Sequence, residues 1–185
     1  MKKNLSPGAD GYYFRVRPST GGVSSGASER VAPAVLAQGI ASVLGGPAAT
    51  LVRSGGGELV ASSLAGKVVA FYCSASWCPP CKQFTPQLAA FYNRARAAGR
   101  PFEVVFVSCD RDQTSMDSYL GHMPWPAIPY GSPAREAALA TLKVQGIPQL
   151  TVFGRDGKVV EQSAVQSVFA PNSLDRWEAG RPAGA

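Results

Sequence analysis

The chain has 185 residues, of which 45% are hydrophobic and 16% are charged, and its formal net charge is +6. These proportions are those of a globular protein with one well-buried domain, and they exclude a largely disordered chain. The basic residues are scattered, with Lys2-Lys3 as the longest like-charge run, so no nucleic-acid-binding patch is predicted.

Residues 1–30 are rich in Gly, Ser and Pro and carry mostly basic charges, so we expect a flexible extension. The basic start has no apolar stretch behind it, which argues against a secretory signal peptide. The stretch from Val31 to Leu44 is too short and too rich in Ala and Gly to span a bilayer, so no membrane association is expected. A cytoplasmic location is predicted, with mitochondrial targeting through the extension as the alternative.

Residues 31–177 are expected to form a single domain, followed by a disordered tail at residues 178–185. The domain opens with apolar residues spaced three and four apart, which predicts a short helix that ends at Gly45-Gly46-Pro47. The face of this helix carries Leu36, Ile40, Val43 and Leu44. Two short apolar segments, 50–52 and 58–60, then flank a glycine-rich turn and predict a β-hairpin.

Two nearly continuous apolar runs, Lys67–Cys73 and Phe102–Cys109, predict strands that are buried on both faces, as in a parallel sheet. The segment between them has apolar residues at helical spacing and ends at Gly99-Arg100-Pro101, so strand, helix and strand form a βαβ unit. The predicted helix face carries Cys81, Phe84, Leu88, Phe91, Tyr92 and Ala95.

Further helices are predicted around residues 114–120 and 134–144. Segments 150–153 and 158–160 flank an Asp-Gly turn and predict a closing antiparallel hairpin. Together these elements predict an α/β fold in which helices cover both faces of a central mixed sheet.

Two cysteines separated by two residues lie where the first buried strand meets its helix, in Trp77-Cys78-Pro79-Pro80-Cys81. Because Cys78 starts the helix, unpaired backbone N–H groups and the helix dipole are directed at its sulfur and stabilise a thiolate. Cys78 is therefore the predicted nucleophile and Cys81 the resolving thiol. Pro79 and Pro80 fit the first helical turn, and Trp77 offers an apolar docking face. The sequence predicts a dithiol–disulfide oxidoreductase that needs no further cofactor.

A zinc site is the main alternative reading of the Cys-x-x-Cys spacing. The other candidate ligands, Cys73, Cys109 and His122, include no second closely spaced pair, so no metal is expected. A purely structural disulfide is disfavoured in a reducing compartment. Cys73 and Cys109 end buried strands and are expected to be core residues, with a regulatory thiol as the alternative. His122 is expected in a solvated loop.

The dithiol and its surroundings resemble the thioredoxin superfamily, and within it the tryparedoxin and nucleoredoxin branch. The Pro-Pro pair between the cysteines and Met123-Pro124-Trp125 favour this branch, because ordinary thioredoxins carry Gly-Pro between their cysteines. The other matching segments are Ser74-Ala75-Ser76-Trp77, Phe84-Thr85-Pro86, Phe102–Ser108, Asp110-Arg111-Asp112 and Gly146-Ile147-Pro148. The resemblance implies a thioredoxin-like fold in which a cis peptide bond precedes Pro148, beside the dithiol. It also implies that Ile147 and Pro148 bind the substrate chain together with Trp77, Pro79 and Pro80.

The resemblance implies electron transfer from a low-molecular-weight dithiol, of the trypanothione or glutathione type, or from a reductase, to the disulfides of peroxiredoxin-like proteins. Tyr72 stands where thioredoxins carry a buried acid, so Tyr72 itself or water would take over proton transfer. The stretch 160–167 lacks the arginines with which tryparedoxins bind their reductant, which leaves the donor open. The alternative function is a redox-sensitive binding module of the nucleoredoxin type, and an oxidase or isomerase of a secretory compartment is disfavoured. A monomer is expected.

Overall fold

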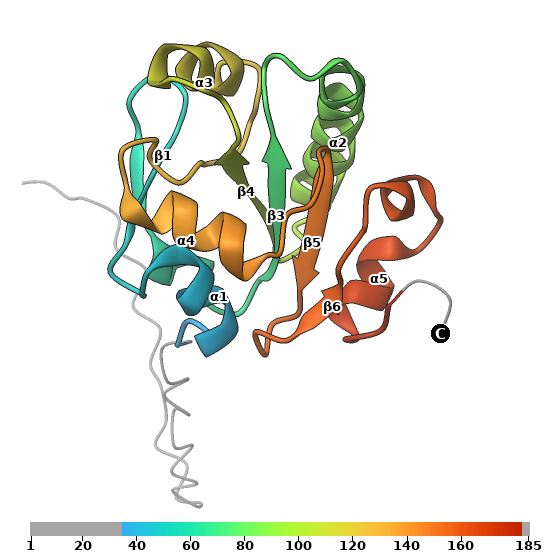
Figure 1. The fold of residues 1–185 in the computed structure, drawn as a ribbon. Coiled ribbons are helices and arrows are strands. Elements are labelled where there is room, and N and C mark those ends of the chain that lie inside the picture. The colour runs from blue at the N-terminus through green and yellow to red at the C-terminus, as the bar shows by residue number, and fades with distance from the viewer. Residues whose placement is uncertain (1–34, 183–185) are drawn as a thin grey trace, which may run out of the picture. The chain divides into compact units, whose positions relative to one another are not determined.

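The computed structural model describes residues 35–182 (Figure 1), so the predicted extension at residues 1–30 lies outside the described residues. The central sheet has the strand order β4-β3-β5-β6. Its strands are β3 (Val68–Ser74), β4 (Phe102–Ser108), β5 (Gln149–Phe153) and β6 (Val159–Glu161). β3 pairs in parallel with β4 and antiparallel with β5, which confirms the predicted mixed sheet and its closing hairpin.

Both apolar runs of the sequence form central strands, and every residue of β3 and β4 is buried. Successive side chains of a strand point to opposite faces of the sheet, so each face of β3 contributes to a different hydrophobic cluster. Val68, Ala70 and Tyr72 face α2 (Pro79–Ala97), whereas Val69, Phe71 and Cys73 face α1 (Gln38–Leu44) and α4 (Pro133–Thr141). The prediction of helices on both faces is therefore confirmed.

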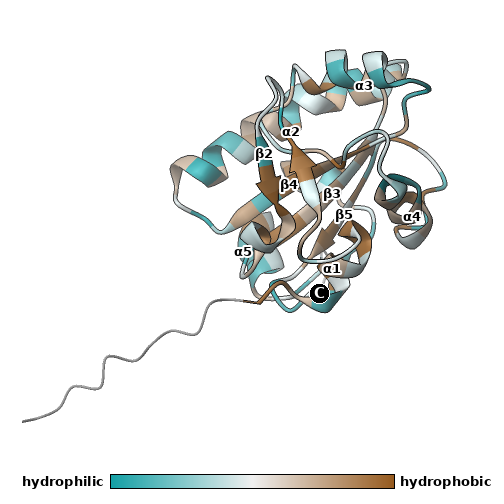
Figure 2. Cartoon of the chain, turned by 90° about the vertical axis from the view of Figure 1, so that its left-hand side faces the viewer, coloured by the Kyte–Doolittle hydropathy of each residue, from teal (hydrophilic) through white to brown (hydrophobic). Residues whose placement is uncertain are grey.

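The remaining helices and a hairpin complete these two layers (Figures 1 and 2). α3 (Gln113–Leu120) and α5 (Ser173–Glu178) lie on the α2 side, and the hairpin β1–β2 (Thr50–Val52, Glu58–Val60) is antiparallel, as predicted. Single turns of 3-10 helix span Ala61–Leu64 and Gln166–Phe169. In Figure 2 the central strands are coloured hydrophobic while α2 and α3 carry hydrophilic residues on their outer surfaces. None of the helices within residues 35–182 is long and apolar enough to cross a membrane.

Most element boundaries lie within one or two residues of the predicted ones, and two of the differences have a clear physical cause. α4 ends at Thr141, before the predicted residue 144, and Lys143 beyond it has a left-handed φ of 51° that a continuing helix does not allow. The tail predicted from residue 178 starts too early, because Glu178 is the last residue of α5 and its carboxylate forms ion pairs with Arg100 (2.8 Å) and Arg155 (2.9 Å).

Candidate redox site

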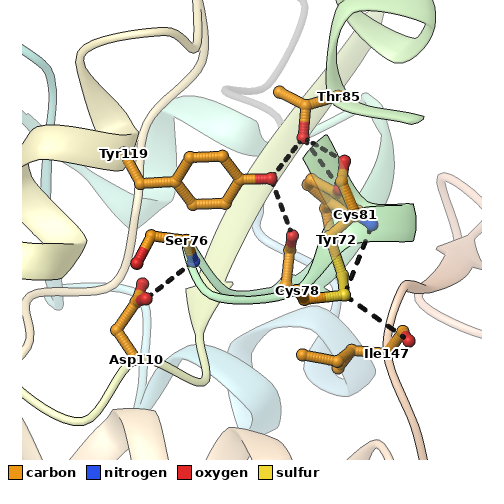
Figure 3. Close-up of a disulfide and its surroundings, with 9 residues drawn as sticks. Tyr72, Ser76, Cys78, Cys81, Thr85, Asp110, Tyr119 and Ile147 are labelled. Atoms are coloured by element: carbon orange, nitrogen blue, oxygen red, sulfur yellow. Dashed lines mark hydrogen bonds between the residues drawn. A yellow bond between two sulfur atoms is a disulfide. The ribbon is translucent and has the colours of Figure 1, made fainter. Parts of the chain in front are cut away.

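The dithiol lies at the start of α2, where Cys78 is the N-cap residue and Pro79 and Pro80 are the first two helical residues, as predicted. Cys78 and Cys81 are at disulfide distance, with their Cα atoms 5.2 Å apart (Figure 3). The backbone N–H of Cys81 donates to Cys78 Sγ over 3.3 Å. Because the free N–H groups of a helix start favour negative charge, this geometry stabilises a thiolate at Cys78.

The loop before β5 closes one side of the site. The peptide bond between Ile147 and Pro148 is cis, as the family resemblance implied, and the carbonyl oxygen of Ile147 lies 3.9 Å from Cys78 Sγ. Ile147 also packs against the buried cluster of Ala75, Cys78 and Cys81. This loop contributes Ile147 and Pro148 to the predicted substrate surface. It therefore lies beside Cys78 Sγ, the predicted nucleophile.

An exposed aromatic side chain directly precedes the dithiol in the chain. The side chain of Trp77 is 52% exposed, and the guanidinium carbon of Arg111 lies 5.8 Å from its ring centroid. Pro79 and Pro80 are exposed next to it. A large apolar side chain left in solvent beside a reactive group is typical of a docking surface for another molecule.

Hydroxyl groups occupy the buried side of the dithiol, where thioredoxins carry an acid. The hydroxyls of Tyr72 and Tyr119 lie 2.9 Å and 2.6 Å from Thr85 Oγ1, which donates to the Cys81 carbonyl oxygen over 2.9 Å (Figure 3). Tyr119 is also within 3.1 Å of Ser74 Oγ. Burial raises the pKa of Tyr72, so its hydroxyl is neutral at physiological pH. Thr85 and Tyr119 also line a cavity of about 480 Å³ at the surface.

Sequence reasoning gave no role to Thr85 or Tyr119. Thr85 lies next to Phe84 on the buried side of α2, and a single threonine beside an apolar stripe has no distinctive pattern. Tyr119 comes from α3, and its approach to Thr85 depends on how that helix packs. The family resemblance includes Thr85 in the matching segment Phe84-Thr85-Pro86, but it assigns no role to this hydroxyl.

Asp110 supports the loop that carries the dithiol. Its carboxylate accepts a hydrogen bond from the backbone N–H of Ser76 over 2.7 Å and another from the Ser108 hydroxyl over 2.8 Å. In the sequence, Asp110 stood out only as part of Asp110-Arg111-Asp112, a segment that matches the tryparedoxin and nucleoredoxin branch. The signal that could have found it is an acidic residue directly after a strand buried on both faces, where the ends of parallel strands meet.

Both remaining cysteines are free, and they differ in exposure. Cys73 is fully buried in β3, as expected of a core residue, whereas Cys109 follows β4 and is half-buried. Burial raises the pKa of both thiols, that of Cys109 to about 11. His122 is exposed in the turn after α3, as predicted. Among residues 35–182, no group of three or more His, Cys, Asp or Glu side chains is arranged to hold a metal ion.

Comparison with known proteins agrees with this geometry. A family model described as thioredoxin-like matches residues 66–159. Probable nucleoredoxin 1 of Arabidopsis thaliana is 43% identical over 115 residues, which make up 62% of this chain and 20% of that protein. The chain thus spans about a fifth of the length of this relative.

Two solved structures are similar over most of the described chain. Native tryparedoxin I from Crithidia fasciculata superposes with a TM-score of 0.67 and 37% identity, covering 76% of this chain and 96% of that one. A tryparedoxin II complexed with glutathionylspermidine has a TM-score of 0.63 and 32% identity, covering 70% of this chain and 90% of the other.

Proposed function

The chain belongs to the thioredoxin-like family, and from that premise we propose that it is a thiol–disulfide oxidoreductase of the tryparedoxin type that reduces protein disulfides. The observation that carries the proposal is the Cys78–Cys81 pair at the first turn of α2, with Cys78 Sγ 3.9 Å from the carbonyl oxygen of the half-buried Ile147. No cofactor other than this disulfide is needed. We also propose a monomer that works in the cytoplasm, with mitochondrial targeting as the alternative.

In the proposed reaction the Cys78 thiolate attacks one sulfur of the substrate disulfide and releases the other as a thiolate. Cys81, one helical turn later, then attacks Cys78 Sγ, so that the Cys78–Cys81 disulfide forms and the second substrate thiol leaves. Two electrons pass from the protein to the substrate. The N–H groups at the start of α2 stabilise Cys78 both as nucleophile and as leaving group, because both require a thiolate.

The substrate chain is proposed to lie across the surface made by Trp77, Pro79, Pro80, Ile147 and Pro148. The exposed indole of Trp77 supplies apolar contact area, and the half-buried Ile147 backbone is close enough to Cys78 to align a peptide beside the sulfur. Backbone pairing recognises an extended chain without regard to its sequence, which suits a reductase with several protein substrates, such as peroxiredoxins.

For the electron donor we propose a small dithiol of the trypanothione or glutathione type. The similarity to a tryparedoxin II solved with glutathionylspermidine supports this choice. The stretch 160–167 takes a different role here, because Glu161 at the end of β6 accepts hydrogen bonds from Trp177 Nε1 (2.7 Å) and from Ser167, and so holds α5 in place. A protein reductase is therefore the alternative donor.

A second candidate function is that of a redox-sensitive binding module, as in nucleoredoxins. The exposed Trp77 next to Arg111 favours it, since tryptophan and arginine are the side chains that most often dominate protein interfaces. Such a module would bind its partner through the surface around Trp77 and would not need the dithiol to reduce substrate disulfides.

Reduction of insulin disulfides tests the proposal, with dithiothreitol, trypanothione and thioredoxin reductase as electron sources in parallel. We expect turnover with the dithiols, loss of turnover in Cys78→Ser, and unchanged turnover in Cys73→Ala, which removes a buried thiol away from the disulfide. Absence of turnover with every donor, combined with unchanged partner capture by Cys78→Ser, would instead support the binding module.

A further inference from the structure

Cys109 is the free thiol that packs against the cluster containing the disulfide. Ala75, Cys78 and Cys81 form a small buried cluster, and within residues 35–182 the partly buried hydrophobic residues that pack against it are Cys109 and Ile147. We propose that Cys109 is a third redox cysteine of the site, which resolves mixed disulfides on Cys78 by closing a Cys78–Cys109 disulfide. This inference rests on the proposed function, because it needs a mixed disulfide at Cys78.

The backbone holds Cys109 beside the loop that leads to Cys78. The N–H of Cys109 donates to the carbonyl oxygen of Ser74 over 2.8 Å, one step beyond the last β3–β4 pair. The N–H of Cys78 in turn donates to the carbonyl oxygen of Ala75 over 3.2 Å. These two hydrogen bonds therefore hold the backbone of Cys109 and that of Cys78 to the same segment, at Ser74 and Ala75.

Cys109 shares its packing contacts with Ile147, the residue beside Cys78 Sγ. Both Cys109 and Ile147 pack against the disulfide cluster and also against the hydrophobic cluster beneath α1 and α4. Cys78 Sγ is 3.9 Å from the Ile147 carbonyl oxygen, while Cys81 is buried on the inner face of α2. In a mixed disulfide on Cys78, the sulfur that Cys109 attacks is that of Cys78, which lies beside Ile147.

The step balances without an added oxidant. After Cys78 has bonded to a substrate sulfur, the Cys109 thiol gives its proton to solvent, and its thiolate attacks Cys78 Sγ. The Cys78–Cys109 bond forms as the bond from Cys78 to the substrate breaks, and the departing substrate thiolate takes a proton. Cys78 and Cys109 are oxidised to a disulfide, and the substrate disulfide is reduced to two thiols.

The surroundings of Cys109 make it a slow resolving thiol. Burial raises the pKa of the Cys109 thiol from 9.0 to about 11, and the nearby Asp110 acts in the same direction, while the Arg135 guanidinium of α4 opposes them. Cys73 is the titratable neighbour on β3. The thiolate fraction of Cys109 at neutral pH is thus about a hundredfold below that of an unperturbed thiol.

The experiment uses the full chain with Cys81→Ser, which leaves Cys109 as the only candidate resolving thiol near Cys78. The reduced variant is mixed with insulin, quenched with acid, and digested without reductant for mass spectrometry of disulfide-linked peptides. We expect release of the insulin chain at a rate about a hundredfold below wild type, together with a linked peptide pair that contains Cys78 and Cys109.

Two double variants serve as controls. Cys81→Ser with Cys109→Ser should trap the insulin adduct on Cys78, and Cys81→Ser with Cys73→Ala should behave as Cys81→Ser alone. If Cys109→Ser does not fold, as judged by circular dichroism, the linked peptide of Cys81→Ser decides by itself.

A stable insulin adduct in Cys81→Ser without any Cys78–Cys109 peptide would overturn the inference and leave the proposed function standing, because the adduct itself requires attack by Cys78. Absence of any adduct in every variant would overturn the proposed function as well.

Discussion

The backbone N–H of Ser76 donates to the carboxylate of Asp110 over 2.7 Å, and this bond joins the loop after β4 to the loop that ends at Cys78 (Figure 3). Asp110 is only 5% exposed, and its second oxygen accepts from the Ser108 hydroxyl. A buried carboxylate with a donor on each oxygen holds both loops rigidly, because breaking either bond leaves a buried charge short of a partner. The place of Cys78 therefore depends on a residue that follows the neighbouring strand.

Replacing Asp110 with Ala is expected to lower the free energy of unfolding by about 2 kcal/mol, since Ser76 N–H and the Ser108 hydroxyl both lose a charged acceptor. Looser placement of Cys78 should also lower kcat/KM for insulin reduction by about tenfold. Urea unfolding and steady-state rates measure the two effects. Asp110→Asn keeps one acceptor oxygen and should lie between Ala and wild type.

Asp112 provides the matched control for this prediction. It is exposed and caps α3 through Ser115, whose backbone N–H donates to its carboxylate over 2.8 Å. Asp112→Ala should lower the stability slightly, through the lost helix cap, and leave the insulin rate unchanged. Equal effects of the two substitutions on the rate would remove the positioning role from Asp110.

In the reduced protein, iodoacetamide should modify Cys78 first, Cys109 much later and Cys73 last. The N–H groups at the start of α2 favour the thiolate of Cys78, whereas burial raises the pKa of Cys109 to about 11 and that of fully buried Cys73 still further. Timed alkylation at pH 7.5 with peptide mass spectrometry measures the three rates. Equal rates at the three sites would contradict the stabilising role of the helix start.

Stability is expected to fall as pH rises above about 9. Burial raises the folded pKa values of Cys73, Cys109 and Tyr72, and that of Tyr92 to about 12. At a pH between its unfolded and folded pKa, each group has lost its proton in the unfolded state and keeps it in the folded state. A rise in pH therefore stabilises the unfolded state relative to the folded state. Each contributes a loss of about 1.4 kcal/mol per pH unit in that window.

The contribution of one thiol to this loss is measurable. Cys73→Ala removes one titrating group, so its unfolding free energy between pH 9 and 11 should fall less steeply than that of the wild type by about 1.4 kcal/mol per unit. Chemical denaturation at several pH values measures the slopes. Parallel slopes for the two proteins would mean that Cys73 titrates alike in the folded and unfolded states.

The central layers of this fold could be predicted because their signals are local. Continuous apolar runs with no alternation mark β3 and β4, and the Pro-Pro pair after Cys78 marks the first turn of α2. The site itself was harder to predict. Contacts such as Ser76 with Asp110 and Thr85 with Tyr119 join residues 34 positions apart in each case, and no periodicity of either segment encodes which partner it meets.

The half-buried position of Cys109 could not be predicted for a related reason. The sequence places it at the end of a buried run, where a cysteine most often serves as a small core residue. Whether such a residue faces the core or the loop of the neighbouring strand depends on where pairing ends, and here β4 stops at Ser108. The last residue of a run is therefore the position at which burial is hardest to predict.

The C-terminal boundary gives the last prediction. Trp177 is fully buried, with its ring stacked on Phe102 at 6.1 Å and its Nε1 donating to Glu161, while Glu178 pairs with Arg100. A variant that ends at Arg176 should lose about 3–5 kcal/mol of stability, as expected for removal of a buried aromatic side chain. A variant that ends at Pro182 keeps every one of these contacts and should unfold at the same urea concentration as the whole chain. If the shorter variant were equally stable, Trp177 and the residues after it would add nothing to the core, and the predicted domain of residues 31–177 would be too long at its C-terminal end.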